Sequence, residues 1–366
     1  RALEAQGKEI IHLEIGEPDF DTPRHIVEAG MQAISDGFTH YGPTAGLPEL
    51  REAIARNSRE VRGTNTDPAN VVVTPGAKPI MFYTLLALGE PGVEVIYPNP
   101  GFPIYESMIR FTGATPVPMR LFEERAYHPD LDALAGLITD KTRLIILNSP
   151  ENPCGSALTK AELETIANLV KQHPGIYVMA DEIYKDILYT GDHYSIASIP
   201  GMEERTIILD GFSKSYAMTG WRLGYGIVPE ELVPHVVKLA VNSVSCAATF
   251  TQKAGIAALE GPKDGVEAMA AEFAVRRRLI ADGLRSIPGI KCPEPEGAFY
   301  AFPSIEGTGL SSGEFEDRAM AEAGVALLSG GAFGEYGEGY VRLSYANSQE
   351  NIQKAIDQLD RLVRAL

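Results

Sequence analysis

The sequence of 366 residues contains only three cysteines, Cys154, Cys246 and Cys292, and they lie far apart. They form no CxxC pair and no Cys/His ligand pattern, so the sequence predicts neither a disulfide framework nor a metal site. No apolar run approaches the roughly 18 residues of a membrane-spanning helix, and no basic segment followed by an apolar one opens the chain. We therefore expect no membrane span and no signal peptide, and a reducing, cytoplasmic setting.

Basic residues are also scarce, because 32 Lys and Arg stand against 49 Asp and Glu and leave a formal net charge of −17. A field of this sign repels nucleic acids and acidic membrane surfaces, which are excluded as expected partners. The composition, 45% hydrophobic and 22% charged, is typical of a folded globular protein. The first residue is Arg1 within a helix-like pattern, so we expect further residues to precede it.

Short apolar runs alternate with longer helical periods through the first two thirds of the chain. In one such period Thr159 is placed to cap a helix over residues 159–173. The alternation predicts an α/β fold, a three-layer and mostly parallel sheet with helices on both faces, whose ligands lie beyond the carboxyl ends of the strands. The predicted strands are residues 71–74, 93–97, 143–147, 176–180, 206–209 and 223–228.

The pattern changes after a long helical region at residues 230–285, with breaks near residue 261. Short strands at residues 298–302 and 340–345 and a terminal helix then predict a smaller α+β unit, against which the first twenty residues are expected to pack. We predict two domains, a large one of residues 20–280 and a small one of residues 1–19 and 281–366.

Polar residues gather where four of the predicted strands end, at residues 74–78, 148–155, 181–184 and 211–225. Taken singly, each segment also fits a turn, a helix cap or a solvated surface residue. Because ligands of such sheets lie at the carboxyl ends of the strands, the four segments together indicate a ligand site.

The most specific motif is Ser-Lys-Ser-Tyr-Ala-Met-Thr-Gly-Trp-Arg-Leu-Gly-Tyr at residues 213–225. With the further motifs, the whole chain resembles the fold-type-I pyridoxal-phosphate enzymes, specifically the class I/II aminotransferases of the aspartate aminotransferase type. The resemblance implies a pyridoxal 5′-phosphate cofactor and the transfer of an amino group from an L-amino acid to a 2-oxo acid, 2-oxoglutarate, in a ping-pong cycle. The further motifs, in family order, are residues 16–20 (GEPDF), 41–46 (YGPTAG), 152–155 (NPCG), 181–184 (DEIY) and 342–344 (RLS).

The resemblance implies that Lys214 forms the Schiff base with the cofactor and later moves the substrate proton. A partly desolvated lysine beside other cations has a lowered pKa, as this role requires. By the same resemblance, Asp181 keeps the pyridine nitrogen protonated. Tyr184 and Asn152 bind the ring oxygen, and Phe102 stacks on the ring.

The cofactor phosphate requires N–H donors at a helix N-terminus and a fixed cation. The chain departs from the family at Gly211, where members often carry a serine that contacts the phosphate. Tyr41 resembles a residue that reaches the phosphate in a neighbouring subunit, which implies a homodimer with shared active sites. The phosphate-binding residues implied by the resemblance are Gly76, Ala77, Lys78, Ser213 and Arg222.

Arg342 resembles the arginine that binds the substrate α-carboxylate, assisted by Asn152 and the Gly16 backbone, since a guanidinium holds a carboxylate in bidentate fashion. Lys78 resembles a lysine that approaches the distal carboxylate in a bacterial aspartate aminotransferase subgroup. We therefore predict aspartate as the favoured amino donor.

Three alternatives remain beside this prediction. The pocket could take alanine, aromatic or aliphatic amino acids, or the same cofactor could serve a carbon–sulfur β-lyase. A non-catalytic effector-binding module of a transcription regulator shares the fold, but no basic helix-turn-helix region is visible. Outside the site, we interpret Cys154 as a small buried side chain and residues 276–278 as a solvated helix face.

Overall fold

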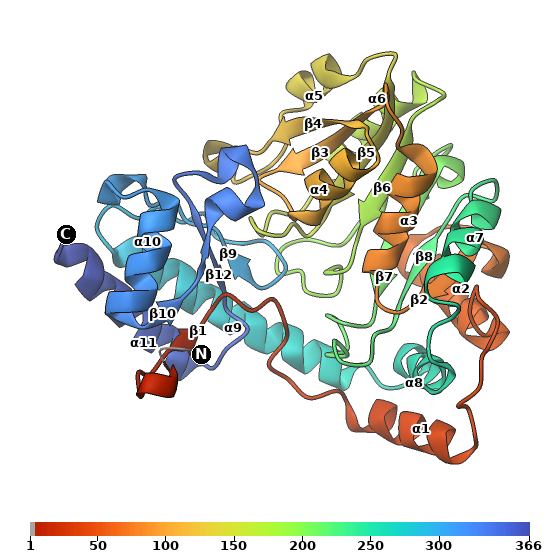
Figure 1. Ribbon diagram of the computed structural model, residues 1–366, viewed down its shortest axis with the longest axis horizontal. Helices are drawn as coiled ribbons and strands as arrows, with labels where there is room; N and C mark the ends of the chain where they lie inside the picture. The colour runs from red at the N-terminus through yellow and green to blue at the C-terminus, as the bar shows by residue number, and fades with distance from the viewer. Residues whose placement is uncertain (1–3) are drawn as a thin grey trace.

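A seven-stranded sheet lies at the centre of the molecule, for which a computed structural model describes residues 4–366 (Figure 1). Its strands are β2 (Val71–Thr74), β3 (Glu94–Asn99), β4 (Thr115–Arg120), β5 (Thr142–Asn148), β6 (Tyr177–Asp181), β7 (Thr206–Gly211) and β8 (Gly224–Ile227). The order across the sheet is β2-β8-β7-β6-β5-β3-β4. Only β8 runs antiparallel to its neighbours, and the other adjacent pairs are parallel. The first three residues of the helix-like opening lie outside the described residues.

Helices cover both faces of this sheet, as the sequence predicts. Successive strand residues point to opposite faces, so Leu144 and Ile146 of β5 join one core cluster and Ile145 and Leu147 join another. On the first face lie α3 (Lys78–Leu88), α4 (Ile104–Phe111) and α7 (Val233–Ser243). On the second lie α2 (Pro48–Arg62), α5 (Leu131–Leu137), α6 (Lys160–Lys171) and α8 (Thr249–Glu260), with α1 (Arg24–Ser35) packed along α8.

All six predicted strands of this sheet are present, and their ends agree within two residues. Thr159 caps α6 as predicted, in a capping box with Glu162. The seventh strand, β4, escaped the sequence reading because Pro116 and Pro118 interrupt its pattern. Proline has no N–H for a ladder, and β4 tolerates two because it lies at the edge of the sheet.

A C-terminal unit, made of the remaining short strands with α10 and α11, lies beside the large sheet (Figure 1). Two of its strands and α11 confirm the predicted pattern, and β1 pairs in parallel with β10, which joins the N-terminal residues to this unit. The elements are β1 (Ile11–His12), β9 (Tyr300–Ala301), β10 (Val325–Ala326), β11 (Leu328–Ser329), β12 (Val341–Ser344), α10 (Ser312–Arg318) and α11 (Gln349–Arg364).

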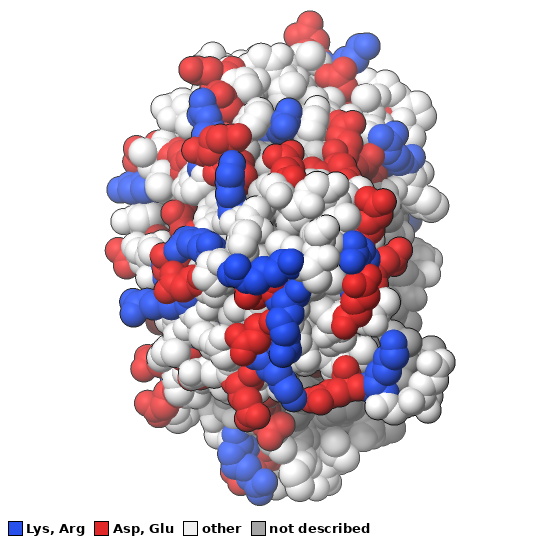
Figure 2. Space-filling view, turned by 90° about the vertical axis from the view of Figure 1, so that its left-hand side faces the viewer, with Lys and Arg blue, Asp and Glu red and all other residues white. Residues whose placement is uncertain are grey.

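The long helix α9 (Asp264–Ser286) runs from the large sheet to the C-terminal unit (Figure 1). The predicted domain boundary at residue 280 falls within this continuous helix, so the two-domain division stays a prediction. Figure 2 views the side on which α10 and α11 lie, where basic side chains are interspersed with acidic ones. Within residues 4–366, no helix combines the length and apolar character needed to cross a membrane.

The interpretation of residues 276–278 as a solvated face is wrong. Arg276 and Arg277 are buried, and only Arg278 is exposed. Arg276 forms ion pairs with Asp19 at 2.6 Å and with Glu272 at 2.8 Å, and Arg277 pairs with Glu294. Because α9 packs between two units, this side of the helix faces protein. Cys154, by contrast, is buried as predicted.

Candidate active site

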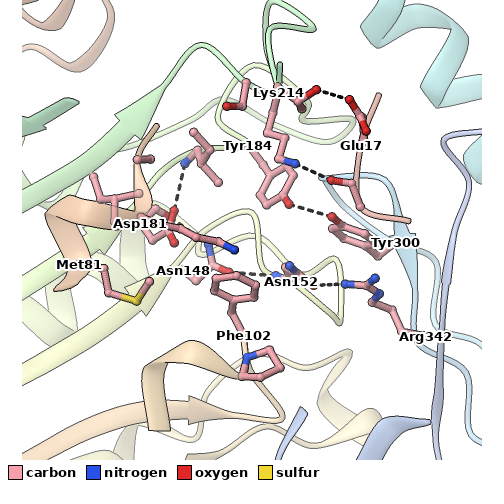
Figure 3. Close-up of a pocket in the computed structure, with 18 of the residues that line it drawn as sticks. Glu17, Met81, Phe102, Asn148, Asn152, Asp181, Tyr184, Lys214, Tyr300 and Arg342 are labelled. Carbon is pink, nitrogen blue, oxygen red and sulfur yellow. Dashed lines mark hydrogen bonds between the residues drawn. The ribbon is translucent and has the colours of Figure 1, made fainter. Parts of the chain in front are cut away.

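A pocket of about 620 Å³ lies where β5, β6 and β7 end and the C-terminal unit begins (Figure 3). Eleven of the thirteen predicted site residues line it, namely Gly16, Ala77, Lys78, Phe102, Asn152, Asp181, Tyr184, Ser213, Lys214, Arg222 and Arg342. Gly76 lies just behind the lining, against the Arg222 guanidinium. Tyr41 does not line the pocket, and 89% of its side chain is exposed.

Lys214 follows β7 and extends its amine into the pocket, where Nζ donates a hydrogen bond of 2.5 Å to the Gly16 carbonyl oxygen. Burial is the largest cause that lowers the pKa of this amine to about 8; Glu17 opposes the shift, and the nearby cations of Arg342, Lys78 and Arg222 add to it. A substantial fraction of the amine is therefore neutral near pH 8, as attack on an aldehyde requires.

Asp181 ends β6 and is buried at the floor of the pocket. Its Oδ2 atom accepts a hydrogen bond of 2.6 Å from the Tyr105 hydroxyl, and Oδ1 accepts one of 3.3 Å from the backbone N–H of Ile183. Burial raises the pKa of this carboxyl to about 6, with the Tyr105 hydroxyl opposing the rise. In the described part of the chain no Lys or Arg forms an ion pair with Asp181, so the carboxylate suits a protonated ring nitrogen of a ligand.

Tyr184 and Asn152 both line the pocket (Figure 3). The Tyr184 hydroxyl is 2.9 Å from the hydroxyl of Tyr300. The backbone N–H of Asn152 donates to the side-chain oxygen of Asn148 at 2.9 Å, which orients the Asn152 loop. Phe102 presents its ring to the same space, with the Lys78 ammonium 5.4 Å from the ring centroid.

Arg342 reaches the pocket from β12 and is buried without a carboxylate partner among the described residues. Its Nη1 donates to the Asn152 side-chain oxygen at 3.1 Å, and its Nη2 donates to the Glu14 carbonyl at 2.6 Å. Its Nε is buried and has no hydrogen-bond partner in the described chain. A buried cation with an unused donor favours an anionic ligand, and a carboxylate fits that requirement.

The turn between β2 and α3 has the features of a phosphate site. Gly76 has a φ of +82°, and a Cβ there would overlap the Arg222 guanidinium, so only glycine allows this approach. The Arg222 Nη1 atom donates to the Thr219 carbonyl at 2.8 Å, which holds the cation beside the start of α3. Ala77, Lys78 and Ser213 complete this end of the pocket. Backbone N–H groups at a helix start and a fixed guanidinium suit a phosphate ester.

The family departure at Gly211 has a packing reason. A Cβ at this position would lie 3.0 Å from the Cα of Gly224, where β7 and β8 pair closely. A serine here would require the two strands to shift.

Among the lining or supporting residues that were not predicted as part of the site, four have polar side chains that bond to other residues of the site, namely Glu17, Tyr105, Asn148 and Tyr300. Glu17 accepts a hydrogen bond from the Thr219 hydroxyl and lies within the GEPDF motif, which was the signal for it. Tyr105 lies only three residues after the predicted site residue Phe102, which is a weaker indication that it supports the site. Nothing in the sequence around Tyr300 distinguishes a pocket residue from an ordinary core residue of a strand.

The chain is similar to known proteins along nearly its whole length. The family model "Aminotransferase class I and II" matches residues 8–359. An aspartate aminotransferase of Pyrococcus abyssi is 43% identical, covering 98% of this chain and 92% of its own. An aromatic-amino-acid aminotransferase 2 of Thermococcus litoralis is 41% identical, covering 98% and 93%. The crystal structure of an aromatic aminotransferase from Pyrococcus horikoshii has 42% identity and a TM-score of 0.95, covering 100% of this chain and 98% of that one.

Proposed function

This chain belongs to the class I and II aminotransferases, and we propose that it transfers the amino group of L-aspartate to 2-oxoglutarate. It is a transaminase that uses pyridoxal 5′-phosphate and acts on an amino acid and a 2-oxo acid. The observation that carries the choice of donor is a pair of cations in one pocket. Arg342 has an unused Nε, and Lys78 forms no ion pair in the described chain. Two cations suit a substrate with two carboxylates.

When bound, pyridoxal phosphate supplies an electron sink for negative charge on the substrate α-carbon. Asp181, as a carboxylate, would hold a proton on the pyridine nitrogen. Tyr184 and Asn152 would each donate a hydrogen bond to the ring oxygen, and Phe102 would cover the ring. Lys214 would accept the proton from the substrate α-carbon and return it, because its lowered pKa of about 8 leaves a substantial fraction of the amine neutral near that pH.

The phosphate group would be held at the turn between β2 and α3. The backbone N–H groups of Gly76, Ala77 and Lys78 lie at the start of α3, and the Arg222 guanidinium lies beside them. Ser213 adds a hydroxyl. In this proposal Arg342, with Asn152 and the Gly16 backbone, orients the α-carboxylate, and Lys78 takes the distal one. Asn152 and Arg342 are buried, so their interactions with the α-carboxylate are strengthened by the exclusion of water, whereas Lys78 and Arg222 are exposed.

We also propose a homodimer with shared active sites. Tyr41 is 89% exposed and does not line the pocket of its own chain, which supports a role at a neighbouring subunit. Large apolar side chains on α1, Met31 and Ile34, are exposed as well. Sedimentation of the purified enzyme tests whether it is a dimer. Tyr41→Phe is expected to weaken cofactor binding while the protein stays dimeric. The two-domain division and the cytoplasmic setting stay predictions.

Aromatic amino acids are the second candidate donors. The rings of Phe102, Tyr300 and Phe333, with Leu328 and Ile15, line the same pocket and would contact an apolar side chain. Relatives of similar identity are named for aspartate and for aromatic amino acids. A pocket with both rings and cations supports both classes, with aspartate favoured by Lys78.

The test compares kcat/KM for aspartate, phenylalanine and alanine, each with 2-oxoglutarate as the acceptor. We expect aspartate to be preferred, and Lys78→Met to lower its kcat/KM about tenfold or more while phenylalanine is little affected. Lys214→Ala, the matched loss of the catalytic amine, should abolish turnover of every donor. Absence of aspartate turnover, or an equal loss for aspartate and phenylalanine in Lys78→Met, would sink the dicarboxylate assignment.

A further inference from the structure

Tyr300 lines the pocket and contacts both Tyr184, proposed to bind the cofactor, and Arg342, proposed to bind the substrate (Figure 3). It belongs to β9 of the C-terminal unit and is 1% exposed. Its hydroxyl is 2.9 Å from that of Tyr184, and its ring centroid is 4.5 Å from Cζ of Arg342. We propose that Tyr300 is a positioning residue that couples the cofactor-binding hydroxyl of Tyr184 to the substrate-binding guanidinium of Arg342. This inference rests on the roles proposed above for these two partners.

The hydroxyl pair has a direction that follows from its chemistry. Each tyrosine hydroxyl has one proton and can also accept hydrogen bonds. If Tyr184 donates its proton to the ring oxygen of the cofactor, the bond between the two hydroxyls must be donated by Tyr300. A hydroxyl that accepts one hydrogen bond becomes a better donor of another. Tyr300 therefore strengthens the bond that Tyr184 makes to the cofactor.

The ring of Tyr300 acts on Arg342 separately from its hydroxyl. The guanidinium lies close to two rings, with Cζ 4.5 Å from the centroid of Tyr300 and 4.9 Å from that of Phe333. Its Nη1 and Nη2 atoms are engaged by Asn152 and the Glu14 carbonyl. Two aromatic rings in contact with a guanidinium attract the cation and restrict its movement. The guanidinium is thereby held in one orientation at the pocket for a carboxylate.

Tyr300 also explains why residue 16 is a glycine. A Cβ on Gly16 would lie 2.5 Å from the Tyr300 hydroxyl oxygen, so the backbone passes directly against this hydroxyl. The carbonyl of Gly16 accepts the hydrogen bond from Lys214. Tyr300 thus contacts Tyr184 and Arg342 and lies against the backbone at Gly16, whose carbonyl accepts the hydrogen bond from Lys214.

The experiment separates the hydroxyl from the ring by spectroscopy and binding. Tyr300→Phe removes only the hydroxyl, Phe333→Leu removes the second ring, and Tyr300→Leu removes both contributions of Tyr300. The control is Tyr345→Phe, because Tyr345 is a buried tyrosine whose hydroxyl also meets another tyrosine, Tyr189 at 3.4 Å, but does not line the pocket. Charged neighbours of the Tyr184–Tyr300 pair, Asp181 and Arg342, remain in every variant.

Two readouts are measured on each holoenzyme. The first is the pH midpoint at which the visible band of the bound cofactor changes. Without the Tyr300 hydroxyl, Tyr184 is a weaker hydrogen-bond donor to the ring oxygen, which then carries more negative charge. This charge retains a neighbouring proton to higher pH. Tyr300→Phe should therefore raise the midpoint by about half a pH unit. The second is the dissociation constant of succinate, which binds without reacting. Phe333→Leu should raise this constant about fivefold and leave the midpoint unchanged.

Tyr300→Leu should change both readouts, and Tyr345→Phe neither. The inference is overturned if Tyr300→Phe and Tyr345→Phe have the same midpoint, or if Tyr300→Leu binds succinate as tightly as Tyr300→Phe. A wild-type protein with no visible cofactor band would refute the proposed function itself. If the wild-type band titrates and Tyr300→Phe does not shift its midpoint, only the inference about Tyr300 is refuted.

Discussion

The Nζ atom of Lys214 donates a hydrogen bond of 2.5 Å to the carbonyl oxygen of Gly16, a residue 198 positions earlier in the chain. Two residues before Gly16, the carbonyl of Glu14 accepts a hydrogen bond from Arg342. One N-terminal segment therefore contacts both the amine proposed to be catalytic and the arginine proposed to bind the substrate. The position of this segment is part of the geometry of the site.

Gly16→Ala should damage the site without unfolding the protein. The added methyl group would lie 2.5 Å from the Tyr300 hydroxyl oxygen, so either the segment or Tyr300 must move. Overpacking of this kind costs about 1–3 kcal/mol. Applied to the transition state, that cost corresponds to a loss in kcat/KM of about fivefold to a hundredfold.

The control for this substitution is Gly136→Ala, at an exposed glycine of α5 with no atom within 4 Å of the added methyl group. It should leave kcat/KM unchanged and stabilise the helix by about 0.5–1 kcal/mol. A Gly16→Ala enzyme as active as the Gly136→Ala enzyme would contradict the close contact.

The capture of pyridoxal phosphate by the cofactor-free protein should depend on the ionisation of Lys214. Only the neutral amine attacks an aldehyde, and the pKa of Lys214 is lowered to about 8, chiefly by burial. The rate of capture, followed by stopped-flow absorbance, should rise with pH through a midpoint near 8. A midpoint near 10.5, the ordinary value for lysine, would contradict the buried environment.

Two variants should move this midpoint in opposite directions. The Lys78 cation lowers the pKa of Lys214, whereas the Glu17 carboxylate raises it. Lys78→Met is therefore expected to shift the midpoint to higher pH, and Glu17→Gln to lower pH. Shifts of the same sign in both variants would mean that the effect is not electrostatic.

Arg62→Met should destabilise the enzyme strongly. The Arg62 side chain is buried at the end of α2, with Nε 2.6 Å from Glu182 and Nη2 2.5 Å from Asp210. Removing one member of a buried ion network leaves uncompensated charge and costs about 3–5 kcal/mol. Urea denaturation of the variant measures the loss.

The matched surface substitution is Arg56→Met, on the same helix. Arg56 pairs with Glu260, and both side chains are about half exposed. Exposed pairs contribute roughly 0–1 kcal/mol, so this variant should remain close to wild type. Equal losses in Arg62→Met and Arg56→Met would rule out a special contribution of the buried network.

Glu151 should make the cofactor-free protein less stable as pH rises. Burial raises the pKa of this carboxyl from 4.5 to about 8, and its Oε1 atom has no partner in the described chain. Between these values the folded chain binds more protons than the unfolded chain. The free energy of unfolding therefore falls with rising pH, by up to about 1.4 kcal/mol per pH unit from this group.

Glu151→Gln cannot ionise and should remove that part of the decline between about pH 4.5 and 8. The comparison is Glu164→Gln, at an exposed glutamate of α6, which should follow the wild-type curve. Denaturation curves across this range give the answer, and parallel profiles for wild type and Glu151→Gln would contradict a protonated Glu151.

The central sheet was predictable because its strands are buried on both faces and read as continuous apolar runs. Strand β4 was not predictable, because its two prolines interrupt the apolar pattern of a strand. They are tolerated because β4 lies at the edge of the sheet. The pairing of β1 with β10 joins residues more than 300 positions apart, and no local pattern contains such information. The misreading of Arg276 has the same origin, because its partner Asp19 comes from a distant segment.

The sequence by itself determined the class of fold, the family resemblance and eleven of the residues that line the pocket, because these depend on residue type and order along the chain. Only the tertiary structure decided that Lys214 has a pKa near 8, that Arg342 retains an unused donor, and that Tyr300 touches both Tyr184 and Arg342. Burial and distance set these properties, and both arise only when segments far apart in the chain pack together.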